Sequence, residues 1–495
     1  MRGDFTRDTF NPARHVSRVL MQQGRVQLDA DFNEQAAVLL RYMRILATDL
    51  LGPHAGPDSR ALGFDILIKG SMIPVEMEPN ADRRAQLLAG LNKGDVVIGP
   101  GRYYVRGLLV ENDRAMLFSE QPGYPFAGPA IDILTNRSEP LLFYLDVWER
   151  HLTYVDDDSI REVALGGPDT CSRAQIAWQV RGLPPPADQT TVDCAAVSSW
   201  PATGDGRLRA RARRDKSDEV CVISPDASYR GAENQLYRVE VHDGGSVGTV
   251  GEHPTFKWSR ENGSVIFPVR SIAETMVGVE HLGRDRRSTL NPGDWVELVD
   301  DGVVFREGAG PLARVEAVDR DGLTVTLSLP EGSDPLPALS REQADARHAL
   351  LRRWDHAGDP ADNGGALMIT ESESTPAGLE DGWIGLEDGI EIWFEQGRRY
   401  RTGDYWLIPA RVATGDVEWP DAVDDQGEPM LDGDDNPIGA ALPPHGPAHY
   451  YAPLFVLPQT QNGQNPRPRD CRCRIRRLPC YPYAFSGAGI GGNNL

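Results

Sequence analysis

The chain has 495 residues, 40% hydrophobic and 25% charged, which is an ordinary globular composition with enough apolar side chains for about two to four domains. Its formal net charge of −22 repels nucleic-acid phosphates and anionic membrane surfaces, so neither is an expected partner. No run of about 18 apolar residues occurs, which excludes a membrane-spanning helix.

The N-terminus is polar and charged and lacks the apolar core of a secretory signal. We therefore expect synthesis in the cytoplasm without Sec-type export. Residues 1–25 read as an extended arm that is rich in arginine, with Arg14, Arg18 and Arg25 as candidate contacts to a partner.

The clearest predicted helix follows this arm. Asp31 is the expected N-cap, and Glu34 completes a capping box three residues later. Gly52-Pro53 ends the helix. Apolar residues spaced by three and four predict one apolar face, which consists of Ala36, Leu39, Leu40, Met43, Ala47 and Leu50. That face must bury itself against the body of the chain or against a partner; both alternatives stay open.

Beyond the helix, short runs rich in Val, Ile, Tyr and Trp, bounded by Gly, Pro, Asn or Asp, predict strands. These runs are Asp65–Lys69, Asp95–Ile98, Tyr103–Glu111, Leu141–Tyr154, Leu236–Val241, Trp295–Val299, Leu323–Leu327, Ile390–Phe394 and Tyr405–Ile408. Only Arg341–Trp354 reads as a further helix. The predicted fold class is mainly β, with several small barrel or sandwich modules behind an N-terminal amphipathic helix.

One segment is typical of a small SH3-like barrel. A Gly-Asp turn at Gly293 precedes an alternating strand, and an Asp-Gly hairpin turn at Asp321 separates two later strands. The predicted organisation is therefore an arm and anchoring helix (1–60), a β-rich region (61–270) with a Pro/Ser-rich loop at 182–203, the barrel (271–335), a β-rich region with a short helix (336–456), and a polar, basic, Gly-rich tail (457–495).

Six cysteines are too few for a disulfide scaffold. Three of them, Cys471, Cys473 and Cys480, cluster and could hold a structural zinc ion together with His445 or His449. Free thiols and a disulfide are the alternatives, and no other cofactor is expected.

Tryptophans and abundant carboxylates leave a carbohydrate-binding or carbohydrate-cleaving site open. The candidate aromatic residues are Trp148, Trp178, Trp258, Trp295, Trp383, Trp393 and Trp406. Tryptophan at strand spacing is more often part of a core, so we expect no catalytic residues and no enzyme activity.

The segment Gly3–Gln35 resembles the opening of an uncharacterised bacterial family encoded with phage tails and contractile injection systems. Further blocks that resemble this family are Pro100–Asn112, Tyr144–Asp157, Glu162–Val180, Phe256–Val269 and Leu386–Arg411. Some members continue into a β-helix like that of tail spikes. No such repeat occurs here up to Leu495, so the resemblance does not extend to polysaccharide cleavage.

The resemblance implies a structural or accessory part of a contractile, phage-tail-like particle, of baseplate, spike or fibre type. Such a particle stays in the cytoplasm or is released. Its other proteins and further copies of this chain are the expected partners, and a spike or fibre would be a trimer. The predicted contacts are Arg14, Arg18, Arg25, Leu39, Leu40, Met43 and Leu50. A protein that binds or cleaves carbohydrate and a cargo of such a particle are the alternatives.

Overall fold

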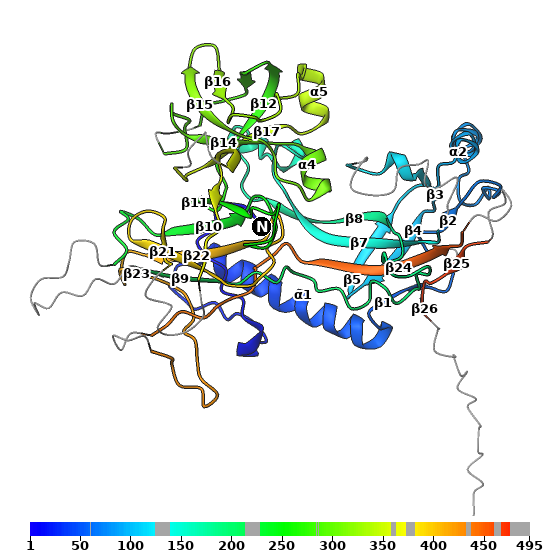
Figure 1. Cartoon of the computed structure of the whole chain (residues 1–495), viewed down its shortest axis with the longest axis horizontal. Coiled ribbons are helices and arrows are strands. Elements are labelled where there is room, and N and C mark those ends of the chain that lie inside the picture. The colour runs from blue at the N-terminus through cyan, green and yellow to red at the C-terminus, as the bar shows by residue number, and fades with distance from the viewer. Residues whose placement is uncertain are drawn as a thin grey trace, which may run out of the picture.

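The computed structural model describes residues 1–475, apart from residues 60, 124–138, 213–227, 284, 286, 358–362, 373–381, 432–436 and 460–466. Strands dominate, as the sequence predicts, and they form several separate sheets and one closed barrel. Figure 1 shows the barrel above two lateral groups of sheets, with one long helix lying beneath them.

The barrel is closed by six antiparallel strands in the order β12-β13-β16-β15-β14-β17. Their bounds are β12 Ile266–Ala273, β13 Met276–Val279, β14 Trp295–Val299, β15 Leu312–Asp319, β16 Thr324–Ser328 and β17 Leu350–Trp354. The barrel therefore begins before and ends after the expected range 271–335. Two short helices accompany it, α4 (Asp301–Arg306) and α5 (Arg341–Ala346).

The predicted helix Arg341–Trp354 is wrong in its second half. Helix α5 ends at Ala346, and residues 350–354 then form β17, which pairs with both β12 and β14. Every residue of β17 is buried, so this strand closes the barrel rather than covering it as a helix would.

The sheets below the barrel, on the side of β21 and β22, share a core around Tyr237, Phe256, Phe394 and Trp406. One sheet has the order β18-β11-β10-β22-β23, and the other contains β19-β21-β20 with β9 paired to β21. The bounds are β9 Leu208–Ala212, β10 Gln235–Val241, β11 Thr255–Ser259, β18 Leu367–Met368, β19 Glu371–Ser372, β20 Ile384–Gly385, β21 Ile390–Glu395, β22 Tyr405–Arg411 and β23 Asp416–Val417.

The other group of sheets has the orders β25-β24-β7-β8, β26-β1-β4-β5 and β2-β3-β6 around a second apolar core. The bounds are β1 His54–Pro57, β2 Ile66–Leu67, β3 Val97–Ile98, β4 Gly101–Val105, β5 Leu108–Asn112, β6 Met116–Leu117, β7 Leu141–Leu152, β8 Arg173–Leu183, β24 His449–Leu457, β25 Arg469–Asp470 and β26 Arg474–Ile475, with helix α2 at Ala81–Lys93. Single 3-10 turns lie at Pro12–Arg14, Phe118–Glu120, Asp158–Ile160, Val163–Leu165 and Asn363–Gly365.

The predicted regions 61–270 and 336–456 do not fold separately. Strand β7 pairs with β24, β9 with β21, and β10 with β22, so each sheet joins segments far apart in the sequence. The first part of the predicted tail joins the sheets, because β25 pairs with β24 and β26 with β1; residues 476–495 lie outside the described part. The first two residues of the predicted loop at 182–203, Gly182 and Leu183, belong to β8, and residues 184–203 contain no strand.

Helix α1 spans Asp29–Leu51 and lies along the underside of the sheets (Figure 1). Its N-cap is Leu28, whose N–H donates to the Asp31 carboxylate at 3.1 Å. The expected N-cap at Asp31 is therefore wrong by three residues. Glu34, expected to complete the cap, instead accepts a hydrogen bond from the Thr9 hydroxyl and so fixes the arm to the helix.

Candidate functional site

The start of the arm is fixed to the body. Arg2 forms an ion pair with the buried carboxylate of Glu240 at 2.8 Å, and the side-chain amide of Asn262 donates to the carbonyl oxygens of Met1 and Gly3. The Thr6 backbone N–H donates to Asp29 at the first turn of α1. These contacts anchor residues 1–6.

From Pro12 onward the arm is mostly exposed. Arg14, Arg18 and Arg25 are exposed, and none of them forms an ion pair with any residue that the structure describes. Leu20 and Val26 are also exposed, at 69% and 84%. No Asp or Glu occurs between Thr9 and Leu28, so the arm is a basic and apolar strip on an acidic protein.

Helix α1 is held to the body by its inner face. Ala30 and Val38 are buried there, and Arg44 forms an ion pair with Glu149 on β7 at 2.7 Å. Gly107, in the turn between β4 and β5, packs directly on the Arg44 backbone. At φ +77° and with that backbone so close, this position accommodates only glycine. The turn also splits the predicted strand Tyr103–Glu111 into a hairpin.

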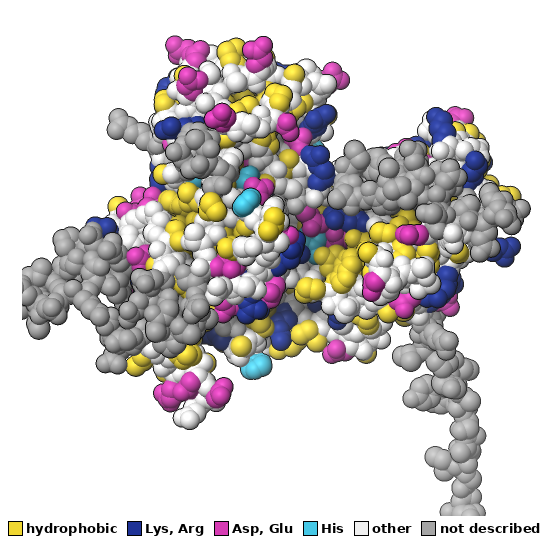
Figure 2. Space-filling model, in the orientation of Figure 1, with side chains coloured by type: hydrophobic (Ala, Val, Ile, Leu, Met, Phe, Trp, Pro, Cys, Tyr) yellow, Lys and Arg dark blue, Asp and Glu magenta, His cyan; other side chains and the backbone are white. Residues whose placement is uncertain are grey.

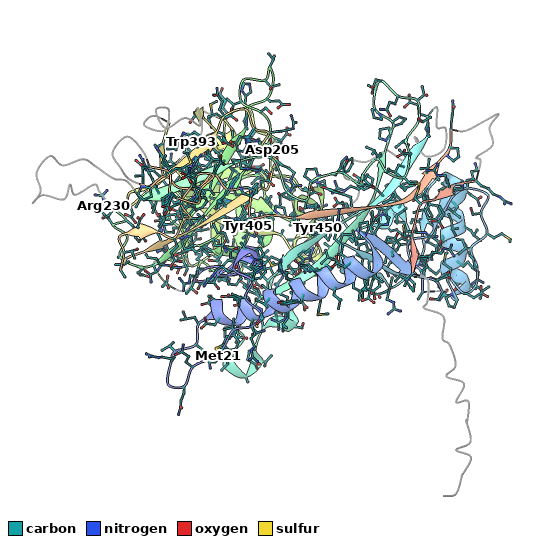
Figure 3. The ribbon with its side chains drawn as sticks, turned by 90° about the horizontal axis from the view of Figure 1, so that it is seen from below. Met21, Asp205, Arg230, Trp393, Tyr405 and Tyr450 are labelled. Carbon is teal, nitrogen blue, oxygen red and sulfur yellow. A yellow bond between two sulfur atoms is a disulfide. The ribbon has the colours of Figure 1, made fainter. Side chains whose placement is uncertain are left out.

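Figure 3 shows α1 running across the underside of the molecule, and its outer face carries exposed apolar side chains. Leu39, Met43 and Leu50 are 54%, 66% and 74% exposed, and Leu40 is 45% exposed. The structure thus places all seven predicted interface residues at the surface. Isolated exposed apolar side chains are normal on proteins, but a continuous row along a helix marks a contact surface.

The predicted zinc cluster does not form from the described cysteines. Cys471 makes a disulfide with Cys194 and has no thiolate to offer a metal. Cys473 is free and exposed, and Cys480 lies outside the described residues. The two candidate histidine ligands are engaged elsewhere: Nδ1 of His445 accepts from the Leu407 N–H, and Nδ1 of His449 contacts Asp146.

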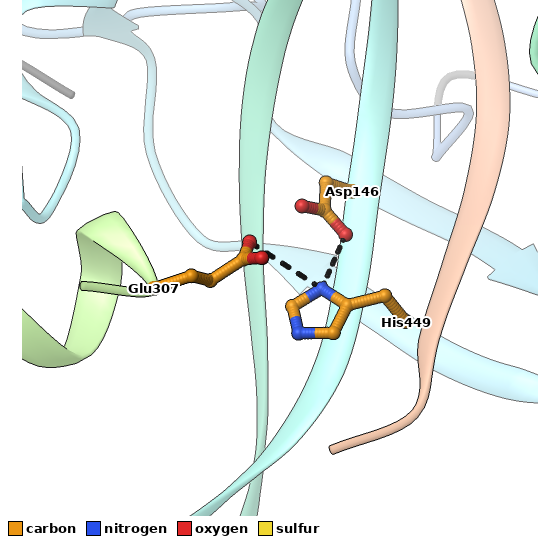
Figure 4. A group of neighbouring side chains, drawn as sticks. All are labelled: Asp146, Glu307 and His449. Carbon is orange, nitrogen blue, oxygen red and sulfur yellow. Dashed lines mark hydrogen bonds and ion pairs between the residues drawn. The ribbon is translucent and has the colours of Figure 1, made fainter. Parts of the chain in front are cut away.

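A group that the sequence reading missed joins the barrel to the sheet of β7, β8 and β24. His449 Nδ1 lies 2.8 Å from Asp146 and 3.5 Å from Glu307, the residue that caps α4 (Figure 4). Arg181 contacts both carboxylates, at 3.3 Å from Asp146 and 2.5 Å from Glu307.

Burial alone would raise the pKa of Asp146, but His449 and Arg181 lower it below its usual value. Burial raises the pKa of Glu307, and the facing Asp146 carboxylate adds to this effect, although His449 and Arg181 oppose it. Two carboxylates and an imidazole are a reasonable donor set for a divalent cation, and their ligand atoms lie within 4.8 Å of one another. The Arg181 guanidinium already supplies the positive charge there, so the group acts as an ionic crosslink.

A second buried charge cluster, the junction cluster, lies where the barrel meets β10 and β11. Lys257 lies 2.7 Å from Glu297 of the barrel and 3.5 Å from Glu240. Arg238 contacts the same Glu240 at 2.6 Å, and the Trp354 indole donates to Glu297 at 2.9 Å. Although burial would raise the pKa of Glu240, the neighbouring cations hold it well below its usual range.

The tryptophans proposed for a sugar groove lie mostly in the core. Trp148, Trp258, Trp295, Trp393 and Trp406 are buried, and Trp178 and Trp383 are half-buried. The Trp178 and Trp406 indoles donate to backbone carbonyls. These side chains do not form a row of exposed aromatic faces of the kind that stack on sugars.

Comparison with known proteins places the chain in one family. A family model described as a family of unknown function (DUF6519) matches residues 1–200 and 198–484. The chain belongs to this family. No curated protein and no solved structure matched the chain.

Within the described residues, no helix has both the length and the apolar character required to cross a bilayer. Figure 2 shows acidic side chains scattered over the barrel.

Proposed function

We propose that this chain is a non-enzymatic structural or accessory component of a contractile, phage-tail-like particle, of baseplate, spike or fibre type, and that residues 1–52 attach it there. The observation that carries the proposal is the exposure of apolar side chains along the arm and α1. The resemblance of the N-terminal segment to proteins encoded with such particles supplies the setting.

The arm offers chemistry suited to an acidic protein surface. Arg14, Arg18 and Arg25 are exposed beside exposed apolar side chains, and no Asp or Glu lies between Thr9 and Leu28 to balance their charge. Opposite charge across an interface steers encounter and selects the partner. The acidic remainder of the chain would at the same time repel that surface, which directs attachment to the arm.

The difference between the inner and outer faces of α1 supports the proposal. The inner face packs on the body through Val38 and Arg44, and the outer face with Leu39 and Met43 does not. An N-terminal element that is rigidly held and still presents an apolar surface is suited to attachment.

Point substitutions test this proposal better than removal of residues 1–52. Since Arg2 neutralises the buried Glu240, a truncated chain would lose a core ion pair as well as the arm. The experiment uses tagged full-length chain added to native particles from a strain that lacks it, and measures cosedimentation.

The triple variant Arg14→Glu, Arg18→Glu, Arg25→Glu should lose cosedimentation. A control with the same change in charge is Arg341→Glu, Arg347→Glu, Arg399→Glu, which alters exposed arginines elsewhere and should cosediment like the unmodified chain. Equal retention of both variants would contradict the proposal. Protection of the bound chain from added protease inside intact particles would instead identify it as cargo.

A further inference from the structure

The exposed face of α1 follows a heptad pattern. Its apolar residues alternate in spacing between four and three, and they are Phe32, Ala36, Leu39, Met43, Leu46 and Leu50. We call this row the α1 seam. This alternation repeats every seven residues and is the signature of a helix that packs along another helix, since it keeps one seam facing the partner.

The seam points away from the chain's own body. Phe32, Met43 and Leu46 are 58%, 66% and 60% exposed, whereas Ala30 and Val38 on the opposite side are buried. Arg44 and Gly107 fix this orientation through the ion pair to β7 and the close backbone packing described above. The helix cannot rotate to bury the seam without breaking both contacts.

The positions that flank the seam favour an identical partner. In coiled coils these positions usually carry charges that select or reject a partner helix. Here they are Asn33, Gln35, Leu40, Tyr42, Ala47 and Asp49, with a single charged residue among them. Copies of the same helix would therefore meet little like-charge repulsion, and each copy supplies the same heptad row.

The width of the apolar face sets the number of copies. Leu40 and Tyr42 lie on either side of the seam and are 45% and 52% exposed. A pair of helices buries mainly the narrow seam and leaves such flanking residues in water, whereas a bundle of three covers them.

We infer that the α1 seam is occupied by the α1 helices of two further copies of this chain, which form a three-helix bundle from which the β-domains project. This inference rests on the proposed role of residues 1–52 as an attachment element and names the partner of α1. The basic arm then remains available to bind the particle.

Light scattering after size exclusion, on the full chain without particles, tests the inference. The unmodified chain should show the mass of three copies, and the variant Leu39→Glu, Met43→Glu should show the mass of one, because a bundle core excludes unpaired carboxylates. The matched control is Met72→Glu, Val163→Glu, which places the same charges at apolar residues 86% and 85% exposed outside the seam, and should keep three copies. Circular dichroism of each variant confirms that the fold is retained.

A monomeric or dimeric unmodified chain would overturn the inference, as would a trimer that survives the seam substitutions. Neither result depends on particles. A trimer that fails to cosediment with particles would defeat the proposed function alone, and a monomer that binds them through the arm would defeat only the bundle.

Discussion

Helix α1 exposes apolar side chains to water, whereas the junction cluster buries charged ones. Along α1, Leu39, Met43 and Leu50 are exposed, while in the junction cluster Lys257 and Glu240 are almost completely buried. The buried charges are balanced by one another inside the chain. The exposed apolar side chains are not covered by any described part of the chain, so α1, unlike the junction cluster, leaves apolar surface in contact with water.

The largest expected effect comes from breaking the junction cluster. Lys257→Met would leave Glu297 and part of the charge on Glu240 without a counterion in a buried site. The free energy of unfolding should fall by about 3–5 kcal/mol, measured by denaturant titration.

The control for this change is Arg341→Met, which removes an exposed arginine whose nearest carboxylate, that of Asp345, is 3.8 Å away. It should leave the denaturation midpoint unchanged. Equal effects of the two substitutions would show that the junction cluster contributes no more to stability than an exposed arginine does.

Lifting α1 from the body should have the next largest effect. Gly107→Val would place a branched side chain against the Arg44 backbone at a positive φ. The expected loss is about 1–3 kcal/mol of unfolding free energy, with faster proteolytic cleavage within α1. The neighbouring exchange Leu109→Val, at a site 39% exposed, provides the control and should change neither quantity appreciably.

Lowering the pH should destabilise the junction cluster before it affects helix α1. Burial lowers the pKa of His242 and of His356 to about 4, and the Lys257 ammonium adds to this effect on both. Between pH 6.5 and about 4 the unfolded histidine binds a proton that the folded one does not, so stability falls as pH falls. Each histidine contributes up to about 1.4 kcal/mol per pH unit in that window.

The variant His356→Phe isolates one of these contributions. Phenylalanine can keep the stacking on Trp295 but does not titrate, so the decline in unfolding free energy between pH 6.5 and 4 should become shallower. A decline with an unchanged slope would show that other groups govern the acid response.

The smallest effect on stability is expected for the seam substitutions themselves. Because Leu39 and Met43 are exposed in one copy, Leu39→Glu, Met43→Glu should alter the free energy of unfolding of the isolated chain by no more than about 0.5 kcal/mol. Thermal unfolding at high dilution measures this. A large loss there would mean that the seam packs against the chain's own body.

Local sequence patterns predicted what is local in the structure. The hairpin at Asp321 and strand β14 follow from turn residues and alternating side chains, and the barrel contains both. The helix over residues 29–51 follows from its periodicity, but its N-cap does not, because Glu34 binds Thr9 of the arm. Strand β17 is short, and its apolar residues Leu350, Leu351 and Trp354 fit the three- and four-residue spacing of a helix as well as a buried strand, so the sequence pattern does not separate the two.

The sequence does not show which distant segments pair in one sheet. Nothing in the residues of β7 specifies that they pair with β24 some 300 positions later, so the predicted domain ranges followed the chain rather than the sheets. In the sequence, the only sign of the junction cluster is that Arg238 and Glu240 occupy alternate positions among the apolar residues of β10. Likewise, the periodicity of α1 defines an apolar face but not whether the body or a partner covers it.

The placement of the barrel makes it exchangeable. The chain leaves β11 at Ser259 to enter the barrel and returns at Leu367 to β18, which pairs with β11 itself, so the entry and exit lie side by side. A different module grafted between these two points would have to keep Asn262, which donates to Met1 and Gly3 and so fixes the start of the arm. It would also have to bring acidic groups to Lys257 and Arg181, where Glu297 and Glu307 now lie.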